Sequence, residues 1–329
     1  MQRGSDGTLR PPKNEKSFLN VAPELDKLAK FDFVPLLNKD STNMNPGDWT
    51  AIATAIFERR NNGYDGFVVA HGTDTMHFSA TAVAFALGEN LDFPVVFTGA
   101  QTAPDVQHGD ARVNLLRAFK VAASDIAEVV ICFGEYVFRG CRAQKKDERR
   151  FDAFESPAYF PLAYITEEIL ISPWAYRRAS KDGLAEFQSE FAPGIIQVSL
   201  IPGLEPELLC RLIDYERCQG IILQSFGAGN VPNEDKYSLT AFIKKSTESG
   251  KPVLIASQFP ANATLHTAYE PGKTAINAGA IPTGNMTSAC AMVKFRWVLA
   301  QVNKMKLNKE NKLKQIKELM NKKSIGEMD

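Results

Sequence analysis

The residues with the clearest potential for chemistry lie in a short polar turn, His71 to Thr75. Asp65 and the hydrophobic run after it, which ends at Ala70, precede the turn. A helical pattern from Met76 to about Leu87 follows it. A threonine hydroxyl can attack a carbonyl when a neighbouring base takes its proton. Open α/β sheets bind ligands outside the carboxyl ends of their strands, which is where this turn is expected. The turn is therefore the first candidate site.

The same turn has a simpler interpretation. Thr73, Asp74 or Thr75 could merely cap the next helix, since threonine and aspartate are ordinary N-cap residues. For an arbitrary Thr-Asp-Thr segment this interpretation would be preferred. Further sequence features are needed to distinguish a helix cap from a functional site.

Short β-branched runs alternate with helical patterns through the first half of the chain. They predict buried strands at residues 31–37, 66–70, 94–98 and 128–133. A helix between the first two is expected to begin with Asn45 as its cap and Pro46 in its first turn. It should end at Asn61-Asn62-Gly63. The first seventeen residues are polar and rich in Gly, Pro and Lys, and they predict a loop. This alternation is typical of an α/β fold.

A second α/β series occupies the C-terminal part of the chain. The same patterns predict strands at residues 194–200, 220–224 and 252–257, with helices at about 207–214, 236–248 and 287–302. Residues 175–193 between the two series have mixed charges and little periodicity. We therefore expect an N-terminal domain at 1–180, a linker at 181–193 and a C-terminal domain at 194–329.

Composition excludes several classes of protein. The 38 basic and 38 acidic side chains cancel, and the Lys-rich C-terminal helix is explained by a solvated face, so we expect no nucleic acid or membrane partner. The five cysteines are odd in number and form no Cys-x-x-Cys pair, which argues against a disulfide framework and a zinc site. No apolar run approaches the roughly 18–20 residues that span a bilayer. We therefore expect a small-molecule ligand and a reducing compartment.

The segment His71-Gly-Thr-Asp-Thr-Met76, placed after an Asp-Gly-aliphatic strand, resembles the signature of the L-asparaginase family residue for residue. Further matches occur in the same order as in that family and cover nearly the whole chain. They are Asp40-Ser-Thr-Asn-Met44, Val96-Phe-Thr-Gly-Ala-Gln101, Arg139-Gly-Cys-Arg-Ala-Gln-Lys145, Phe151-Asp-Ala-Phe-Glu-Ser-Pro157, Leu223–Pro232 and Gly284-Asn-Met-Thr287. The chain most resembles the cytoplasmic, type I-like members.

The resemblance implies a fold and a reaction. The fold is α/β with two domains, a larger N-terminal one with a doubly wound, mostly parallel sheet and a smaller C-terminal α/β one. The reaction is hydrolysis of L-asparagine to L-aspartate and ammonia through a threonine acyl-enzyme, without metal or organic cofactor. Attack on a carboxamide needs a hydroxyl, a group that takes its proton and donors for the oxyanion. A lysine can be that base when its ammonium is partly desolvated and a carboxylate positions it.

The resemblance also implies roles for individual residues. Thr73, Asp74 and Lys145 form the catalytic set, in which Lys145 is the base and Asp74 its partner. Lys146 makes the choice of lysine ambiguous by charge alone, and only the fixed distance to Phe151-Asp-Ala-Phe selects Lys145. The substrate-binding residues are Asp40, Ser41 and Thr42 together with Thr73 and Asp74. Asp74 would bind the α-amino group, and Ser41 with its neighbours would hold the α-carboxylate through neutral donors.

Asn230 lies in a glycine-rich segment of the second lobe. By resemblance it is a candidate for a second site or for an intersubunit contact. Gly227 and Gly229 around it could equally serve a tight turn. Both interpretations stay open.

Two features depart from the family pattern. The family begins with a hydrophobic strand that ends in Gly-Gly-Thr-Ile-Gly-Met, whose threonine is the first nucleophile, and no Gly-Gly-Thr occurs in this sequence. Residues Met1 to Pro11 match the final methionine of that motif and the segment after it, so we expect a start assigned to an internal methionine rather than a chain that has lost its first strand. The chain as written would then be inactive. Thr8 stands where cytoplasmic members often have a tyrosine.

Three functions compete. The preferred one is an asparaginase that acts on L-asparagine. L-glutamine stays open as a second substrate, because one extra methylene in the pocket changes selectivity by only about 1–3 kcal/mol. Resemblance implies a cytoplasmic homodimer or homotetramer. The second is the asparaginase-like subunit of a tRNA-dependent amidotransferase, which normally carries an extra N-terminal domain. The third is a catalytically inactive homologue that binds asparagine or aspartate.

Overall fold

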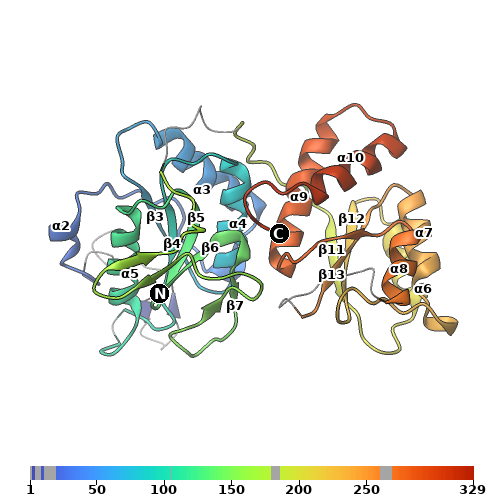
Figure 1. The fold of residues 1–329 in the computed structure, drawn as a ribbon, viewed down its shortest axis with the longest axis horizontal. Coiled ribbons are helices and arrows are strands. Elements are labelled where there is room, and N and C mark those ends of the chain that lie inside the picture. The colour runs from blue at the N-terminus through green and yellow to red at the C-terminus, as the bar shows by residue number, and fades with distance from the viewer. Residues whose placement is uncertain (1, 4–8, 11–19, 105, 179–185, 260–268) are drawn as a thin grey trace. The chain divides into compact units, whose positions relative to one another are not determined.

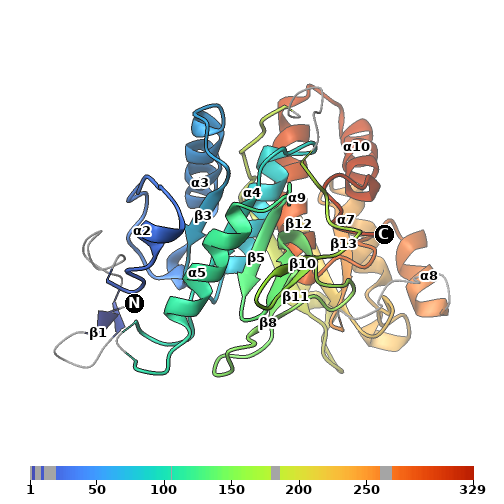
Figure 2. The ribbon, with the colours of Figure 1, turned by 60° about the vertical axis from the view of Figure 1, so that its left-hand side comes forward.

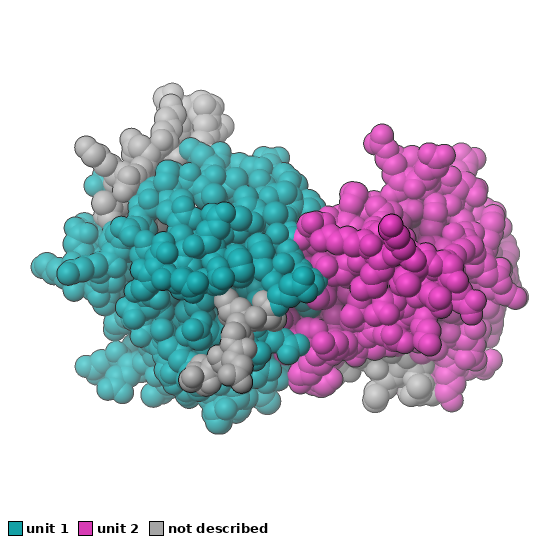
Figure 3. Space-filling model, turned by 90° about the horizontal axis from the view of Figure 1, so that it is seen from above, with its two compact units in different colours: residues 1–189 teal, residues 190–329 magenta. Residues whose placement is uncertain are grey.

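The computed structural model describes residues 2–3, 9–10, 20–104, 106–178, 186–259 and 269–329. The chain divides into two compact units, Met1–Ser189 and Glu190–Asp329, which are coloured separately in Figure 3. Residues 181–185 of the expected linker lie outside the described residues. We keep the limits 1–180 and 194–329 as a proposal for the two domains.

A six-stranded sheet forms the centre of the first unit (Figure 1). Its strands in spatial order are β10 (Ile169–Ile171), β9 (Ala163–Ile165), β6 (Tyr136–Arg139), β5 (Val129–Phe133), β4 (Val95–Thr98) and β3 (Phe67–Ala70). Strands β3, β4 and β5 are parallel, and the pairings of β5 with β6, β6 with β9 and β9 with β10 are antiparallel. The carboxyl ends of β3 and β4 therefore lie at the same edge of the sheet.

Helices pack against this sheet as an α/β fold requires. They are α4 (Met76–Leu87) and α5 (Ala111–Ala122), while α3 (Pro46–Arg59) packs beside α4 and the short α2 (Leu25–Leu28) packs on α5. Helix α5 packs against β3, β4 and β5 and lies in front of this part of the sheet in Figure 2. Its residues Ala118 and Val121 are buried in the core at this contact. Helix α4, built almost entirely from small and apolar residues, is buried along most of its length and packs beside α3. It fills the interior rather than covering the surface.

Helix α3 begins where the sequence predicts. The Asn45 side chain accepts a hydrogen bond from the N–H of Gly47, and the Asp48 carboxylate accepts one from the N–H of Asn45, which completes a capping box. The strands predicted at 66–70, 94–98 and 128–133 are also confirmed, as β3, β4 and β5. Local capping and burial patterns were sufficient for these elements.

Two predictions for the N-terminal region were wrong. Residues 31–37 form no strand, and Val34, Leu36 and Leu37 are exposed, so an apolar run there does not reflect burial in the sheet. The expected loop at the start contains a short antiparallel pair, β1 (Gln2–Arg3) with β2 (Leu9–Arg10). Residues 4–8, including Thr8, and 11–19 lie outside the described residues.

The second unit is built on a parallel four-stranded sheet. Its strands, in spatial order, are β11 (Ile195–Ser199), β12 (Gly220–Ser225), β13 (Val253–Ser257) and β14 (Ile281–Pro282). The helices are α6 (Pro206–Asp214), α7 (Thr240–Glu248), α8 (Glu270–Asn277), α9 (Ser288–Lys304) and α10 (Lys309–Asn321). The three strands and three helices predicted here are confirmed, and so is the two-domain α/β architecture. Among the described residues, no helix is long and apolar enough to cross a bilayer.

A buried ion pair ties the C-terminal segment to α9. Lys294 Nζ donates to Glu327 at 2.6 Å, and neither side chain is exposed to solvent. The same carboxylate accepts the backbone N–H groups of Ser324 and Ile325, while Lys294 also donates to the carbonyl of Lys322. Both charges are therefore fully supplied with partners, which is the condition under which a buried pair persists.

We predict that Glu327→Gln lowers the free energy of unfolding by about 3–5 kcal/mol, because it leaves the Lys294 charge buried without its counter-ion. The matched control is Glu248→Gln, which breaks the exposed pair between Lys244 and Glu248 and should cost less than about 1 kcal/mol. Denaturant titration of both variants gives the comparison. Equal losses of unfolding free energy in the two variants would show that the buried Lys294 pair contributes no more to stability than an exposed pair.

Candidate active site

The turn after β3 is the starting point of the site. The N–H of His71 donates to the carbonyl of Thr98 at 2.8 Å, which extends the pairing of β3 with β4 by one residue. The chain then leaves the sheet and presents Thr73 and Asp74 before α4 begins at Met76. The turn therefore lies at the carboxyl ends of two parallel strands, the position that the sequence predicts for a ligand site.

The structure brings Lys145 to both signature side chains. Its Nζ lies 2.8 Å from Thr73 Oγ1 and 2.6 Å from Asp74 Oδ1. The Lys145 side chain is 13% exposed and that of Asp74 is 60% exposed, and Thr73 is buried. A largely desolvated amine thus contacts one hydroxyl and one carboxylate that opens to solvent.

Lys146 is held elsewhere. Its Nζ lies 3.3 Å from Asp152, at the surface. The geometry removes the ambiguity between the two lysines that charge alone left, because only Lys145 reaches the signature turn.

A small hairpin positions Lys145. Strand β7 (Gln144–Lys145) pairs antiparallel with β8 (Phe154–Glu155), and Lys145 lies opposite the buried Phe154. The N–H of Lys146 donates to the carbonyl of Ala153 at 2.8 Å, and the Gln144 amide donates to Glu155. The pairing register of this hairpin therefore explains why the lysine lies at a fixed sequence distance from Phe-Asp-Ala-Phe.

The second expected segment, Asp40 to Thr42, lies against the signature turn. Thr75 Oγ1 donates to the Ser41 carbonyl at 2.7 Å, and a Cβ placed on Gly72 would lie 2.6 Å from Ser41 Oγ. The Asp40 carboxylate accepts the N–H of Thr42 at 2.8 Å, and this hydrogen bond lowers the pKa of Asp40. Ser41 thus lies beside the turn, while Asp40 caps its own short helix and the Thr42 side chain is exposed.

The helix-cap interpretation of Thr73, Asp74 and Thr75 is not what the structure shows. Thr75 occupies the N-cap position of α4, yet within the described residues no side chain caps that helix end. The hydroxyl of Thr75 is used for Ser41, and Thr73 and Asp74 are used for Lys145. These polar side chains are committed to contacts across the turn.

Gln101 belongs to one of the family motifs, but no role was predicted for it from the sequence. Thr73 Oγ1 donates to Gln101 Oε1 at 3.1 Å, and the backbone N–H of Gln101 donates to the buried Asp110 carboxylate. The signal that could have found it was its place in the turn after β4, three residues beyond Thr98 and at the same sheet edge as Thr73. Gln101 is the additional polar contact of the site.

His77 lies on α4 close to Lys145. Burial lowers the pKa of His77 to about 4, and the charge of Lys145 contributes in the same direction. The imidazole is therefore uncharged at neutral pH and adds no positive charge beside the lysine.

Asn230 lies in the second unit, in a tight turn that is closed by backbone hydrogen bonds between Phe226 and Asn230. Its N–H donates to the carbonyl of Phe226, and the N–H of Phe226 donates back to its carbonyl. Gly227 and Gly229 have φ angles of +46° and +103°, so the turn uses the left-handed conformations that glycine allows. These observations favour the tight-turn interpretation, and a role for Asn230 in a second site or an intersubunit contact stays a prediction.

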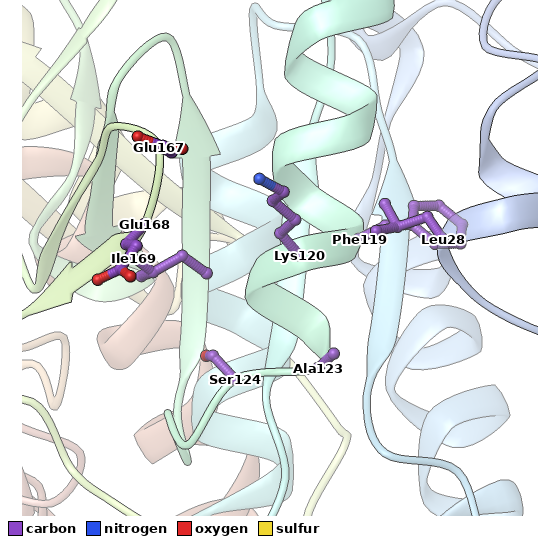
Figure 4. A pocket seen from close by; sticks show the side chains of 8 residues that line it. All are labelled: Leu28, Phe119, Lys120, Ala123, Ser124, Glu167, Glu168 and Ile169. Carbon is purple, nitrogen blue, oxygen red and sulfur yellow. The ribbon is translucent and has the colours of Figure 1, made fainter.

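A hollow on the first unit lies apart from these residues. It has a volume of about 400 Å³ and is shown in Figure 4. Eight residues line it: Leu28, Phe119, Lys120, Ala123, Ser124, Glu167, Glu168 and Ile169. None of the expected site residues is among them, so this hollow is not the candidate active site. In the described part of the chain, no three His, Cys, Asp or Glu side chains gather as metal ligands would.

Comparison with known proteins identifies the two halves of the chain. The family model "Asparaginase, N-terminal" matches residues 1–176, and "Glutaminase/Asparaginase C-terminal domain" matches residues 195–319. The thermostable L-asparaginase of Thermococcus kodakarensis has a solved structure that superposes with a TM-score of 0.85 at 28% identity, over 100% of this chain and 95% of that one.

Individual relatives carry two different names. The L-asparaginase of Thermococcus kodakarensis is 30% identical over 99% of this chain and 97% of its own length. A glutamyl-tRNA(Gln) amidotransferase subunit of Methanothermobacter thermautotrophicus is 32% identical over 92% of this chain and 70% of its own length. With both family models matched and the signature residues in contact, this chain belongs to the asparaginase family.

Proposed function

We propose that the protein hydrolyses L-asparagine to L-aspartate and ammonia. The observation that carries the proposal is the contact of one shielded amine, Lys145 Nζ, with the hydroxyl of Thr73 and the carboxylate of Asp74. Amide hydrolysis needs a group that takes a proton from a hydroxyl or from water at this point of the reaction. Family membership supports the same chemistry.

Each residue has a distinct part in this proposal. Lys145 takes a proton from Thr73, and the Thr73 oxygen takes one from the water that attacks the acyl-enzyme. Asp74 holds Lys145 in place through its 2.6 Å contact. The resemblance assigns formation of the acyl-enzyme to the threonine of the Gly-Gly-Thr motif. No metal or organic cofactor enters the scheme.

The substrate proposal depends on the groups around the turn. The Asp74 carboxylate is 60% exposed and can accept an α-ammonium group while its other contact is kept to Lys145. Ser41, directly against Gly72, can donate its hydroxyl to an α-carboxylate. These groups fit a compact dipolar amino acid, with L-asparagine preferred and L-glutamine as the second substrate. We further propose, from the family and the cysteine pattern, a cytoplasmic homodimer or homotetramer.

A second candidate is the asparaginase-like subunit of a tRNA-dependent amidotransferase. The observation in its favour is that several relatives at 31–33% identity carry the name of such a subunit. A subunit of this kind would pass its ammonia to a partner. Copurification with a tRNA-binding protein from the source organism would favour this candidate, and a lone homo-oligomer with free ammonia release would favour the first.

We predict that Lys145→Met, in the protein expressed from its native gene, lowers kcat for ammonia release by at least about 100-fold, because loss of a positioned base typically costs 10²–10⁴-fold. The matched control is Lys146→Met, which removes the same charge one residue along the chain from a surface pair and should stay near the wild-type rate. A coupled assay for ammonia measures both. Similar losses in the two variants would contradict the assignment of Lys145.

We predict that Gly72→Ala weakens L-aspartate binding on the order of 10-fold or more, because the new methyl would lie 2.6 Å from Ser41 Oγ and displace a hydrogen-bond donor to the ligand. Isothermal titration gives the affinity. The clash should also lower the thermal stability of Gly72→Ala. Adding Ser41→Gly removes the clash, so thermal stability should rise again while the affinity for L-aspartate stays low. Recovery of affinity in the double variant would show that Ser41 is no ligand.

A further inference from the structure

Gln101 is held more firmly than a side chain at an open site requires. Its Nε2 donates to the backbone carbonyls of Asp147 and Arg150, at 3.0 and 3.3 Å. Its own N–H donates to both oxygens of Asp110, a buried carboxylate that also accepts the N–H of Thr102 and the amide of Asn114. Backbone and side chain of Gln101 are thus fixed independently.

The two carbonyls determine which way the Gln101 amide points. Carbonyl oxygens only accept hydrogen bonds, so the NH₂ group has to face Asp147 and Arg150. The amide oxygen must then face Thr73, at 3.1 Å from Oγ1. An amide oxygen is also purely an acceptor, and this makes Thr73 the donor in that contact.

A hydroxyl has one proton to donate. With that proton directed to Gln101, the oxygen of Thr73 meets Lys145 with a lone pair, and Lys145 donates at 2.8 Å. We infer that Gln101 is a positioning residue that fixes the Thr73 hydroxyl between two alternative proton acceptors, its own amide oxygen and Lys145. This inference rests on the proposed function, in which Thr73 and Lys145 exchange that proton.

The inference defines a proton step. In the resting state the Thr73 O–H points to Gln101. For catalysis Lys145 has to be the uncharged amine, after its ammonium has released one proton to solvent. The Thr73 O–H then turns to the lone pair of Nζ, and the O–H bond breaks as an N–H bond forms on Lys145. Thr73 Oγ1 receives a proton from the attacking water, the hydroxide adds to the acyl carbon, and the ammonium of Lys145 balances the negative charge that the carbonyl oxygen gains. Gln101 contacts only the threonine in this step, so it governs the rate of proton transfer rather than the binding of substrate.

Gln101→Leu tests the inference, because leucine keeps the bulk and removes both the acceptor and the donor. We expect kcat to fall on the order of 10-fold, since small misplacements of a catalytic group have effects of this size or larger. KM should stay near its wild-type value, because the lost contact serves the transition state and not ground-state binding. The matched control is Gln107→Leu, the same substitution at an exposed position of the same loop, which should leave both constants unchanged.

Gln101→Glu adds a pH readout. A protonated carboxyl has one O–H, which can replace one of the two hydrogen bonds that the amide donates to the carbonyls of Asp147 and Arg150, whereas an ionised carboxylate has no donor and is repelled by both. The ratio of the variant's kcat to the wild-type kcat should therefore fall as pH rises from about 4 to about 7. A ratio independent of pH would show that the orientation of the amide has no effect on the reaction.

A crystal structure of Gln101→Leu separates this inference from the proposed function. We expect Thr73 Oγ1 to leave its 2.8 Å contact with Lys145 Nζ in this variant and to keep it in Gln107→Leu. An unchanged contact together with an unchanged kcat overturns the role of Gln101. If the wild-type protein releases no ammonia, the proposed function fails, and the crystal structure alone decides whether Gln101 positions Thr73.

Discussion

The contact between one amine, one hydroxyl and one carboxylate is the interaction on which the site depends. A lysine that is 13% exposed loses much of its hydration and needs partners that compensate, and Thr73 and Asp74 supply them. The two partners are adjacent in sequence and come from the end of β3, whereas Lys145 arrives much later in the chain, on the β7–β8 hairpin. Much of the architecture of the first unit serves to bring these two segments together.

Close approach of backbone segments makes that meeting compatible with packing. A Cβ on Gly99 would lie 2.3 Å from the carbonyl oxygen of His71, and one on Gly72 would meet Ser41. Strand ends β3 and β4 and the Ser41 turn can therefore crowd together only because glycine occupies both positions. This crowding directs the polar side chains of the three segments to one place. It also explains why the Thr75 hydroxyl is spent on Ser41 and not on capping α4.

Much of this arrangement could be predicted from the sequence. The strands β3, β4 and β5 and the helix α4 are explained by local burial patterns, and α3 also by its N-cap. The resemblance selected Lys145 over Lys146 by its fixed distance to Phe151-Asp-Ala-Phe. The failures have a common cause. Residues 31–37 are mostly apolar, yet a strand also needs a partner strand that no local pattern specifies. The antiparallel strands β6, β9 and β10 likewise depend on pairing across the sheet. Gln101 was missed because its importance lies in three contacts to residues 28 to 49 positions away.

A crystal structure of the protein with L-aspartate bound tests the central claim most directly. The account predicts that the α-ammonium group of the product contacts the Asp74 carboxylate, that its α-carboxylate faces Ser41, and that its side-chain carboxyl lies beside Thr73 and Lys145. Aspartate bound elsewhere on the chain, with the contacts among Thr73, Asp74 and Lys145 unchanged and no ligand next to them, would contradict it.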